Sequence, residues 1–312
     1  MNLLYRIFFA LPNFSRYGIP GKIVTRLLLK FMKFCFDLFV PGHFKKTSGR
    51  QGNALNTQPR NEQYVVSLTS FPGRINDVWI SIETIMRQTF KPDAIVLWLA
   101  HEQFPDRKLP KSLSDLEKRG LTIKYCENLR SHTKYYFALK EYPEANVITV
   151  EDDCYYPKDT LESLVKLHKE FPGNICANRA HKITFDENGE VKPYRKWLHN
   201  YAGHTQPHHL LVMTGVGGVL YPPHSLNETI FDKETFKRIC FYADDLWLKV
   251  NTDLKGTLVV TTKRFNKDFV TVSKTQNENL VSQNSFGGGN DGQLKDVMEH
   301  FNFKFSEQPQ TR

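Results

Sequence analysis

The sequence predicts an α/β protein with a mostly parallel sheet flanked by helices, and three observations carry this prediction. From residue 64 onward, short apolar runs alternate with segments of helical periodicity. Polar or acidic residues follow several of these runs directly, at the strand ends where parallel sheets bind ligands. The 312 residues, 40% of them hydrophobic, are enough to bury the core of one large domain or two small ones.

The expected elements follow one another as strand, helix, strand. Apolar β-rich runs predict strands at 64–69, 94–100, 121–125 and 146–150. Helical periodicity predicts helices at 78–88 (with Asp77 as its N-cap), 112–119, 132–142 and 244–254. Beyond residue 180 the pattern loosens, and we expect a hairpin of 182–185 with 191–194, a glycine-rich apolar stretch at 210–221 and a strand at 258–262.

The first fifty residues differ in charge from the rest of the chain. They hold nine Lys and Arg residues against one acid, Asp37, whereas the rest of the chain holds 33 bases and 32 acids. The formal net charge of +9 therefore belongs almost entirely to this segment. A nucleic-acid groove on the globular part would need its own positive stripe, and none stands out, so we expect no nucleic-acid partner.

Residues 22–40 combine apolar side chains with a stripe of charges. The charges follow at steps of four, four, three and four, which aligns them along one side of a helix: Lys22, Arg26, Lys30, Lys33 and Asp37. A spanning helix would submerge them at roughly 2.5–3.5 kcal/mol per central charge, whereas an interfacial helix keeps the bases at anionic headgroups. We therefore expect residues 1–45 to associate with an anionic membrane surface. The alternative is a helix packed against the domain or a partner subunit.

Polar stretches mark the expected domain boundaries. Residues 46–62 predict a linker, because they are polar and contain Gly and Pro. The main domain would span 63–263, and residues 264–312 would form a partly flexible C-terminal extension containing Gly287-Gly288-Gly289.

The five cysteines favour free thiols. Their number is odd, their spacing is wide and no Cys-x-x-Cys pair occurs, so a zinc site or a disulfide framework is not expected. The first apolar run also lacks the features of a signal peptide. Together these features favour a reducing, cytoplasmic location.

Three acids directly follow the expected strand at 146–150: Glu151, Asp152 and Asp153. Adjacent carboxylates repel one another unless a cation neutralises them. Mg²⁺ and Mn²⁺ prefer oxygen ligands and keep positions open for phosphate oxygens. The triplet therefore predicts a metal that stabilises a diphosphate leaving group. The alternative is a solvated acidic turn or a helix cap before Pro157.

A second acidic pair, Asp244-Asp245, opens the expected helix at 244–254. Asp245 is placed to accept a proton from an attacking hydroxyl, while Asp244 would cap the helix. The alternative is that both acids only favour the first helical turn.

The remaining candidates are weaker. Lys134 could reach a phosphate, although a surface lysine is the ordinary reading. Thr214–Gly218 has neither the dinucleotide-binding glycine spacing nor a Walker lysine, so we expect its glycines to allow a tight backbone approach beneath a ligand. His204, His208 and His209 lack a nearby Cys or Glu pattern, and we expect ordinary polar residues rather than a zinc site.

The order of these motifs is more specific than any one of them. Ser67–Ile75 ends the first strand, Arg87–Asp93 leads into the second, and Lys134, Val147–Asp153, Thr214–Pro223 and Ala243–Trp247 follow. Together they resemble bacterial glycosyltransferases of the GT-A fold, the family-2-like group of surface-polysaccharide biosynthesis. The resemblance covers roughly residues 62–262.

The resemblance implies a Rossmann-like domain with a nucleotide-diphospho-sugar bound across the first half of the sheet. The implied donor-binding residues are Thr69, Ser70, Phe71, Arg74, Lys134 and Asp152. The family's metal motif is usually Asp-x-Asp, so Asp153 is the expected direct ligand of Mn²⁺ or Mg²⁺, and Glu151 is its companion. Asp245, or its neighbour Asp244, matches the catalytic base of inverting members.

We therefore expect a metal-dependent glycosyltransferase that moves a sugar, with inversion, to a glycan or lipid-linked acceptor. It would be peripheral on the inner face of the cell membrane. One alternative is a sugar-phosphate nucleotidyltransferase, although that group uses a loop richer in glycine, with a lysine, after the first strand. The other is a non-catalytic, membrane-bound scaffold of the same fold.

Overall fold

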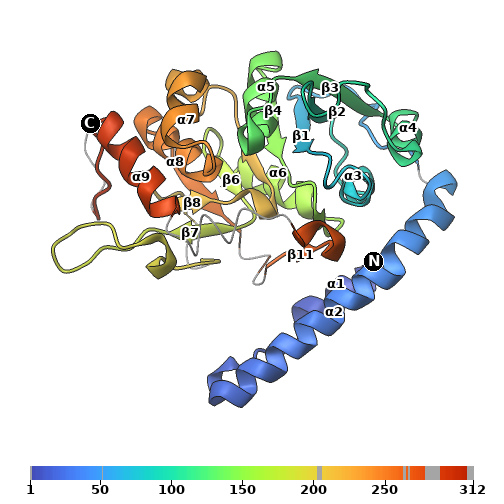
Figure 1. Ribbon diagram of the computed structural model, residues 1–312, viewed down its shortest axis with the longest axis horizontal. Coiled ribbons are helices and arrows are strands. Elements are labelled where there is room, and N and C mark those ends of the chain that lie inside the picture. Colours follow the sequence, from blue (N-terminus) through green and yellow to red (C-terminus); the bar gives the residue numbers. More distant parts are fainter. Residues whose placement is uncertain are drawn as a thin grey trace.

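The computed structural model describes residues 2–50, 52–201, 206–262, 265, 268–277 and 289–307. Its centre is a twisted sheet flanked by helices (Figure 1). This sheet has seven strands in the order β10-β6-β9-β4-β1-β2-β3. The strands are β1 (Tyr64–Ser70), β2 (Ala94–Ala100), β3 (Leu121–Cys126), β4 (Asn146–Thr149), β6 (Ile175–Ala177), β9 (Val219–Tyr221) and β10 (Val259–Thr261). Within this sheet, as far as the described residues form it, only β9 pairs antiparallel with its neighbours, so the predicted mostly parallel sheet is confirmed.

Helices cover both faces of this sheet, which explains why its strands read as continuous apolar runs. Neighbouring residues such as Val65 and Val66 point to opposite faces and belong to different core clusters. One face packs against α3 (Val78–Met86), α4 (Lys111–Glu117) and α6 (Thr160–Glu170). The other packs against α5 (Thr133–Glu141), α7 (Lys233–Ile239), α8 (Asp244–Lys255) and α9 (Gly289–His300). The predicted α/β class with flanking helices is therefore confirmed.

Two short ribbons and several 3₁₀ turns complete the domain. β5 (Cys154–Tyr155) pairs with β11 (Val270–Thr271), and β7 (Ala180–Lys182) pairs with β8 (Leu211–Met213), both antiparallel. The 3₁₀ turns are η1 (Ser15–Tyr17), η2 (Ser48–Arg50), η3 (Arg130–His132), η4 (Tyr194–Lys196), η5 (Gly215–Gly217), η6 (Glu228–Phe231) and η7 (Ser273–Asn277). The β5–β11 ribbon matters for the site, because β5 directly follows the acidic triplet.

The N-terminal helices α1 (Asn2–Ala10) and α2 (Gly18–Thr47) lie along the outside of the domain, beside β11 (Figure 1). α2 buries Met32, Phe36, Val40 and Phe44 in a cluster that includes Tyr155. It continues through Pro41 to Thr47, two residues into the predicted linker. Among the described residues, no helix combines the length and the apolar character needed to cross a bilayer.

Two local expectations differ from the structure. The predicted hairpin is reduced to a bridge between Phe185 and Val191, because β7 pairs with β8 instead and residues 194–196 form η4. The polar C-terminal extension contains α9, which was not predicted because it carries few apolar side chains; Leu294 and Val297 are buried in the core. Gly287 and Gly288 lie outside the described residues, and the division into domains stays a prediction.

Candidate functional site

The candidate site lies at the carboxyl ends of β1 and β4. These two strands are parallel neighbours, and the chain continues from β1 to β2 and β3 on one side but returns to β4 on the other. Such a point of reversal leaves a crevice outside the strand ends, where open α/β sheets bind ligands. Ser70 ends β1, and the triplet 151–153 follows β4.

Arg74 gathers two of the three acids of the triplet. Its Nη1 lies 2.7 Å from Asp152 Oδ1 and 3.1 Å from Asp153 Oδ2, and its guanidinium sits over the Phe71 ring. Ser70 Oγ donates a 2.6 Å hydrogen bond to Asp152 Oδ2. Four residues that the sequence assigned to donor binding (Ser70, Phe71, Arg74 and Asp152) are thus brought together.

Asp152 is the most enclosed of these acids. Burial raises the pKa of its carboxyl, and the nearby Asp153 adds to the rise, while Arg74 and Ser70 act in the opposite direction. The pKa of Arg74 is raised because its carboxylate neighbours outweigh the effect of burial. Thr69 takes a different position, since its hydroxyl donates to Trp98 O on the neighbouring strand at 2.9 Å.

Lys134 joins the two acidic motifs. Its Nζ lies 2.7 Å from Glu151 Oε1 and 2.9 Å from Asp244 Oδ2, and the side chain is 4% exposed. The ordinary expectation of a surface lysine is therefore wrong. Burial disfavours the charged amine, but Asp244 and Glu151 raise the pKa of Lys134 well above its usual value. A buried cation thus holds together acids that lie far apart in the sequence.

The two acids at the start of α8 differ in their environment. Burial acts to raise the pKa of Asp244, but Lys134 and His132 outweigh it and hold that pKa below its usual range. Asp245 accepts a hydrogen bond from the Gly215 N–H at 3.2 Å, and burial together with Asp244 raises its pKa. Asp244 does not cap the helix as expected, because α8 begins at this residue and its carboxylate faces Lys134.

The glycine-rich turn closes against this cluster. A Cβ atom on Gly215 would lie 2.1 Å from Glu151 Oε1, and one on Gly217 would lie 3.0 Å from the backbone nitrogen of Arg179. A side chain at either position would force these neighbours to move, so the glycines allow a close backbone approach. Whether they lie beneath a ligand, as the sequence predicted, stays a prediction. The turn therefore contacts Glu151 and Asp245 on one side and Arg179, which follows β6, on the other.

Arg179 is a candidate that the sequence reasoning missed. It follows the end of β6, and its guanidinium donates to Thr214 Oγ1 at 2.9 Å, Asn200 Oδ1 at 2.6 Å and Asp268 Oδ1 at 2.9 Å. A polar Asn-Arg pair after the apolar residues 175–177 was the available signal. It was overlooked because that strand has only three residues.

The carboxylates of the site leave two possible ligands for the expected metal, Glu151 and Asp153. Among the described residues, no group of three or more His, Cys, Asp or Glu side chains converges as a metal site. Mg²⁺ and similar ions are commonly held by one or two carboxylates together with substrate phosphates. Asp153 and Glu151 are partly exposed, with side chains 13% and 26% accessible, and so fit a metal shared with a phosphate ligand.

The histidines at 208 and 209 make hydrogen bonds to nearby backbone groups. Leu210 N donates to His208 Nδ1 at 2.9 Å, and His209 Nε2 lies 3.1 Å from Ser306 O. His204 lies outside the described residues. All five cysteines are free, as the sequence predicted.

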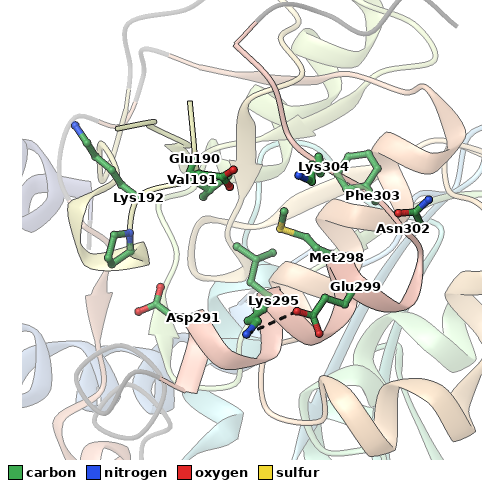
Figure 2. Close-up of a pocket in the computed structure, with 12 residues that line it drawn as sticks. Glu190, Val191, Lys192, Asp291, Lys295, Met298, Glu299, Asn302, Phe303 and Lys304 are labelled. Carbon is green, nitrogen blue, oxygen red and sulfur yellow. Dashed lines mark ion pairs between the residues drawn. The ribbon is translucent and has the colours of Figure 1, made fainter. Parts of the chain in front are cut away.

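A cavity among the described residues lies away from this site. It has a volume of about 540 Å³ and is formed between α9 and the segment 190–193 (Figure 2). Val191, Met298 and Phe303 provide apolar walls, and Lys295 and Glu299 form an ion pair at its edge (Figure 2). None of the residues predicted for the site lines this cavity.

No family model and no curated protein matches the sequence. Among solved structures, a cytidylyltransferase from Leptospira borgpetersenii is 13% identical, with 66% of this chain and 78% of that chain covered and a TM-score of 0.38. CMP:2-keto-3-deoxy-manno-octonic acid synthetase complexed with CTP is 10% identical, with coverages of 64% and 89% and a TM-score of 0.39.

A third similar structure is S. aureus TarS, 14% identical, with 66% of this chain and 59% of that chain covered and a TM-score of 0.42. TM-scores of this size carry no inference about the reaction. The α/β class therefore rests on the sheet and its flanking helices.

Proposed function

We propose that this chain is a metal-dependent glycosyltransferase. It would move a sugar from a nucleotide-diphospho-sugar to a hydroxyl of a glycan or lipid-linked acceptor, in surface-polysaccharide biosynthesis. The observation that carries the proposal is the position of Lys134, whose ammonium contacts both Glu151 and Asp244. This contact brings the motif expected at the leaving group next to the one expected at the attacking hydroxyl.

The donor would bind across the ends of β1 and β4. Phe71 offers a ring face to the nucleoside, and Ser70 and Asp152 offer hydrogen-bonding groups to its ribose, with Thr69 beside them. Arg74 and Lys134 are cations that a diphosphate would meet, since phosphate oxygens accept strong charge-assisted hydrogen bonds. Both cations are now paired with carboxylate oxygens, and the anionic oxygens of a phosphate could take the place of these partners.

Asp153 and Glu151 would hold Mn²⁺ or Mg²⁺. When bound, the metal stabilises negative charge on the departing nucleoside diphosphate. The partial exposure of both carboxylates supports this assignment, because a ligand phosphate must reach the same ion.

Asp245 would act as the general base. The pKa of its neighbour Asp244 is shifted in the opposite direction. The acceptor hydroxyl gives its proton to the Asp245 carboxylate, and its oxygen forms a bond to the sugar carbon. The bond from that carbon to the diphosphate oxygen breaks, and its electron pair leaves with the nucleoside diphosphate. A raised pKa makes a carboxylate a stronger base once it is ionised, and this supports Asp245 over Asp244.

The reaction is tested with a panel of nucleotide-sugars and Mn²⁺. A donor that binds the folded protein raises its melting temperature. We expect Asp153→Asn to lose the Mn²⁺-dependent part of this increase. Asp245→Asn should keep the increase but lose transfer by about 10²–10⁴-fold. Glu144→Gln serves as control, because Glu144 is an exposed acid that pairs with His224.

Full transfer activity in a folded Asp245→Asn protein would contradict the mechanism. Release of pyrophosphate from a nucleoside triphosphate and a sugar phosphate would instead assign nucleotidyl transfer. If no nucleotide binds with or without metal, the chain is a scaffold of this fold.

We also propose that transfer takes place at the inner face of the cell membrane, with the protein peripheral to it. The basic, apolar residues 1–45 support this location, since acceptors linked to lipid would be concentrated at the same surface.

A further inference from the structure

The outer surface of the N-terminal helices is unusually apolar. Fourteen large apolar side chains are exposed among the described residues, and twelve of them lie between residues 3 and 39. Apolar side chains scattered singly over a protein surface are normal, whereas a contiguous exposed patch marks an interaction site. This patch therefore needs a partner.

The two faces of α2 are clearly separated. Met32, Phe36, Val40 and Phe44 recur every four residues and are buried against the domain. The exposed residues Ile23, Leu27, Phe31, Phe34 and Leu38 follow at steps of four, four, three and four. This spacing aligns them in one row, and its phase sets that row on the side of the helix away from the buried residues. We call this row the outer face.

Polar contacts fix the rotation of α2 on the domain. Lys33 Nζ donates to Thr271 Oγ1 at 2.8 Å, and Tyr155 OH donates to Asp37 Oδ1 at 2.9 Å. Two members of the predicted charge stripe thus face the domain. The other three, Lys22, Arg26 and Lys30, are exposed. Each comes one position before a residue of the outer face, so they lie along one side of that face, about a quarter turn away.

We infer that the outer face of α2 docks onto an anionic lipid bilayer, with the helix lying in the plane of the interface. Its apolar row would enter the acyl boundary, while Lys22, Arg26 and Lys30 would meet anionic headgroups. A second copy of the chain is a poor fit, because it would bring together two segments of net charge +8. The inference identifies the surface behind the proposed membrane location, and it holds independently of the sugar transfer.

Sedimentation of the full chain with vesicles tests this surface. We expect binding to vesicles of phosphatidylglycerol and phosphatidylethanolamine, and much weaker binding to phosphatidylcholine alone. Replacing Lys22, Arg26 and Lys30 by Gln should weaken partitioning onto the anionic vesicles by about 100-fold, since each base near such a surface contributes about fivefold.

The apolar contribution is tested with Phe31→Glu/Phe34→Glu, which should reduce binding at least about tenfold. The matched control is Leu198→Glu/Tyr242→Glu, which adds the same charge at two large apolar residues that are exposed in the described part of the chain outside residues 1–47. The four side chains are between 38% and 62% exposed, and the melting temperature of each double variant shows whether it remains folded.

Equal vesicle binding by the two double variants would overturn the inference. So would a self-associated wild type that Phe31→Glu/Phe34→Glu converts to monomer in ultracentrifugation, with lipid binding unchanged. Neither measurement uses a nucleotide-sugar, so failure here is distinct from failure of the proposed reaction.

Discussion

In folded proteins most charged side chains are exposed and most large apolar side chains are buried. Two regions of this molecule depart from this rule in opposite ways. At the candidate site, beside the carboxyl ends of β1 and β4, charged groups such as Lys134 and Asp244 are buried. On α2, by contrast, large apolar groups such as Phe31 are exposed. Buried charges are stable only when they are paired, and exposed apolar patches persist only where they serve an interaction. The contrast teaches that the first region is built around internal electrostatic balance and the second around an external surface.

The largest expected effect comes from removing Lys134, the cation that Glu151 and Asp244 share at the candidate site. Lys134→Met leaves Glu151 and Asp244 without their partner, and we expect the free energy of unfolding to fall by about 3–5 kcal/mol. Chemical denaturation measures the change. The control Lys166→Met removes an exposed partner of Glu162 and should leave stability nearly unchanged. Similar values for both variants would mean that the buried cluster is not electrostatically balanced.

The second prediction compares the buried and the outer face of α2. A substitution on the buried face should lower the free energy of unfolding by a similar amount. Phe36→Ala removes a buried ring that contacts Tyr5 and Tyr155 and should cost about 3–5 kcal/mol. Phe34→Ala, two residues earlier on the outer face, should change the free energy of unfolding by less than about 0.5 kcal/mol. Denaturant titration of the two proteins sharpens the comparison, and it fails if Phe34→Ala is equally costly.

A third effect depends on pH and concerns the buried His132. Its Nε2 lies 2.9 Å from Cys240 O and its Nδ1 2.7 Å from Tyr135 OH, so the neutral ring is satisfied. Burial lowers its pKa to about 4 from the usual 6.5, although Asp244 opposes this shift. The unfolded chain therefore takes up the proton first as pH falls. Stability should decrease between about pH 6.5 and 4, by about 3 kcal/mol in total.

This dependence is measured by unfolding the wild type and His132→Gln across that range. The variant should show a correspondingly flatter curve. The exposed His224→Gln serves as control and should follow the wild type. Identical slopes for all three proteins would contradict the assignment.

The smallest expected effect concerns the glycine turn. Gly215→Ala places a methyl group against Glu151 and should cost about 1–3 kcal/mol, with weaker donor binding. Gly292→Ala is the matched control in α9, where an added Cβ would meet no atom of the described residues within 4 Å, and it should be neutral or slightly stabilising. Melting temperatures and nucleotide-dependent stabilisation distinguish the two, and equal effects would mean that the turn has room to relax.

Much of the fold could be predicted because the parallel strands are buried on both faces. The run at 94–100 became β2 without change, and the strands and helices around it differ by one or two residues at their ends. The three-residue strands β6, β8 and β9 were harder, since so short a run carries no period. α9 was missed because tertiary packing, rather than its own amphipathicity, stabilises it.

The candidate site was predictable in its members but not in their pairing. The acidic triplet was singled out by its position at a strand end, Lys134 and Asp244-Asp245 by their positions at helix starts, and Arg74 by the family resemblance. The sequence did not reveal that Lys134 is buried between Glu151 and Asp244, because that contact depends on how α5 and α8 pack on the sheet. Arg179 was missed for the same kind of reason, since Thr214, Asn200 and Asp268 meet it only in three dimensions.

The β5–β11 ribbon links the two regions mechanically. Lys33 and Asp37 hold the ribbon to α2, while Val272 N–H donates to Asp153 O at 2.7 Å and Arg74 Nε donates to Thr275 O at 3.1 Å. If α2 lay on a bilayer, these contacts would therefore fix the distance between the candidate site and the lipid surface. The length of the tether between a lipid and its sugar would then decide which acceptors can reach Asp245.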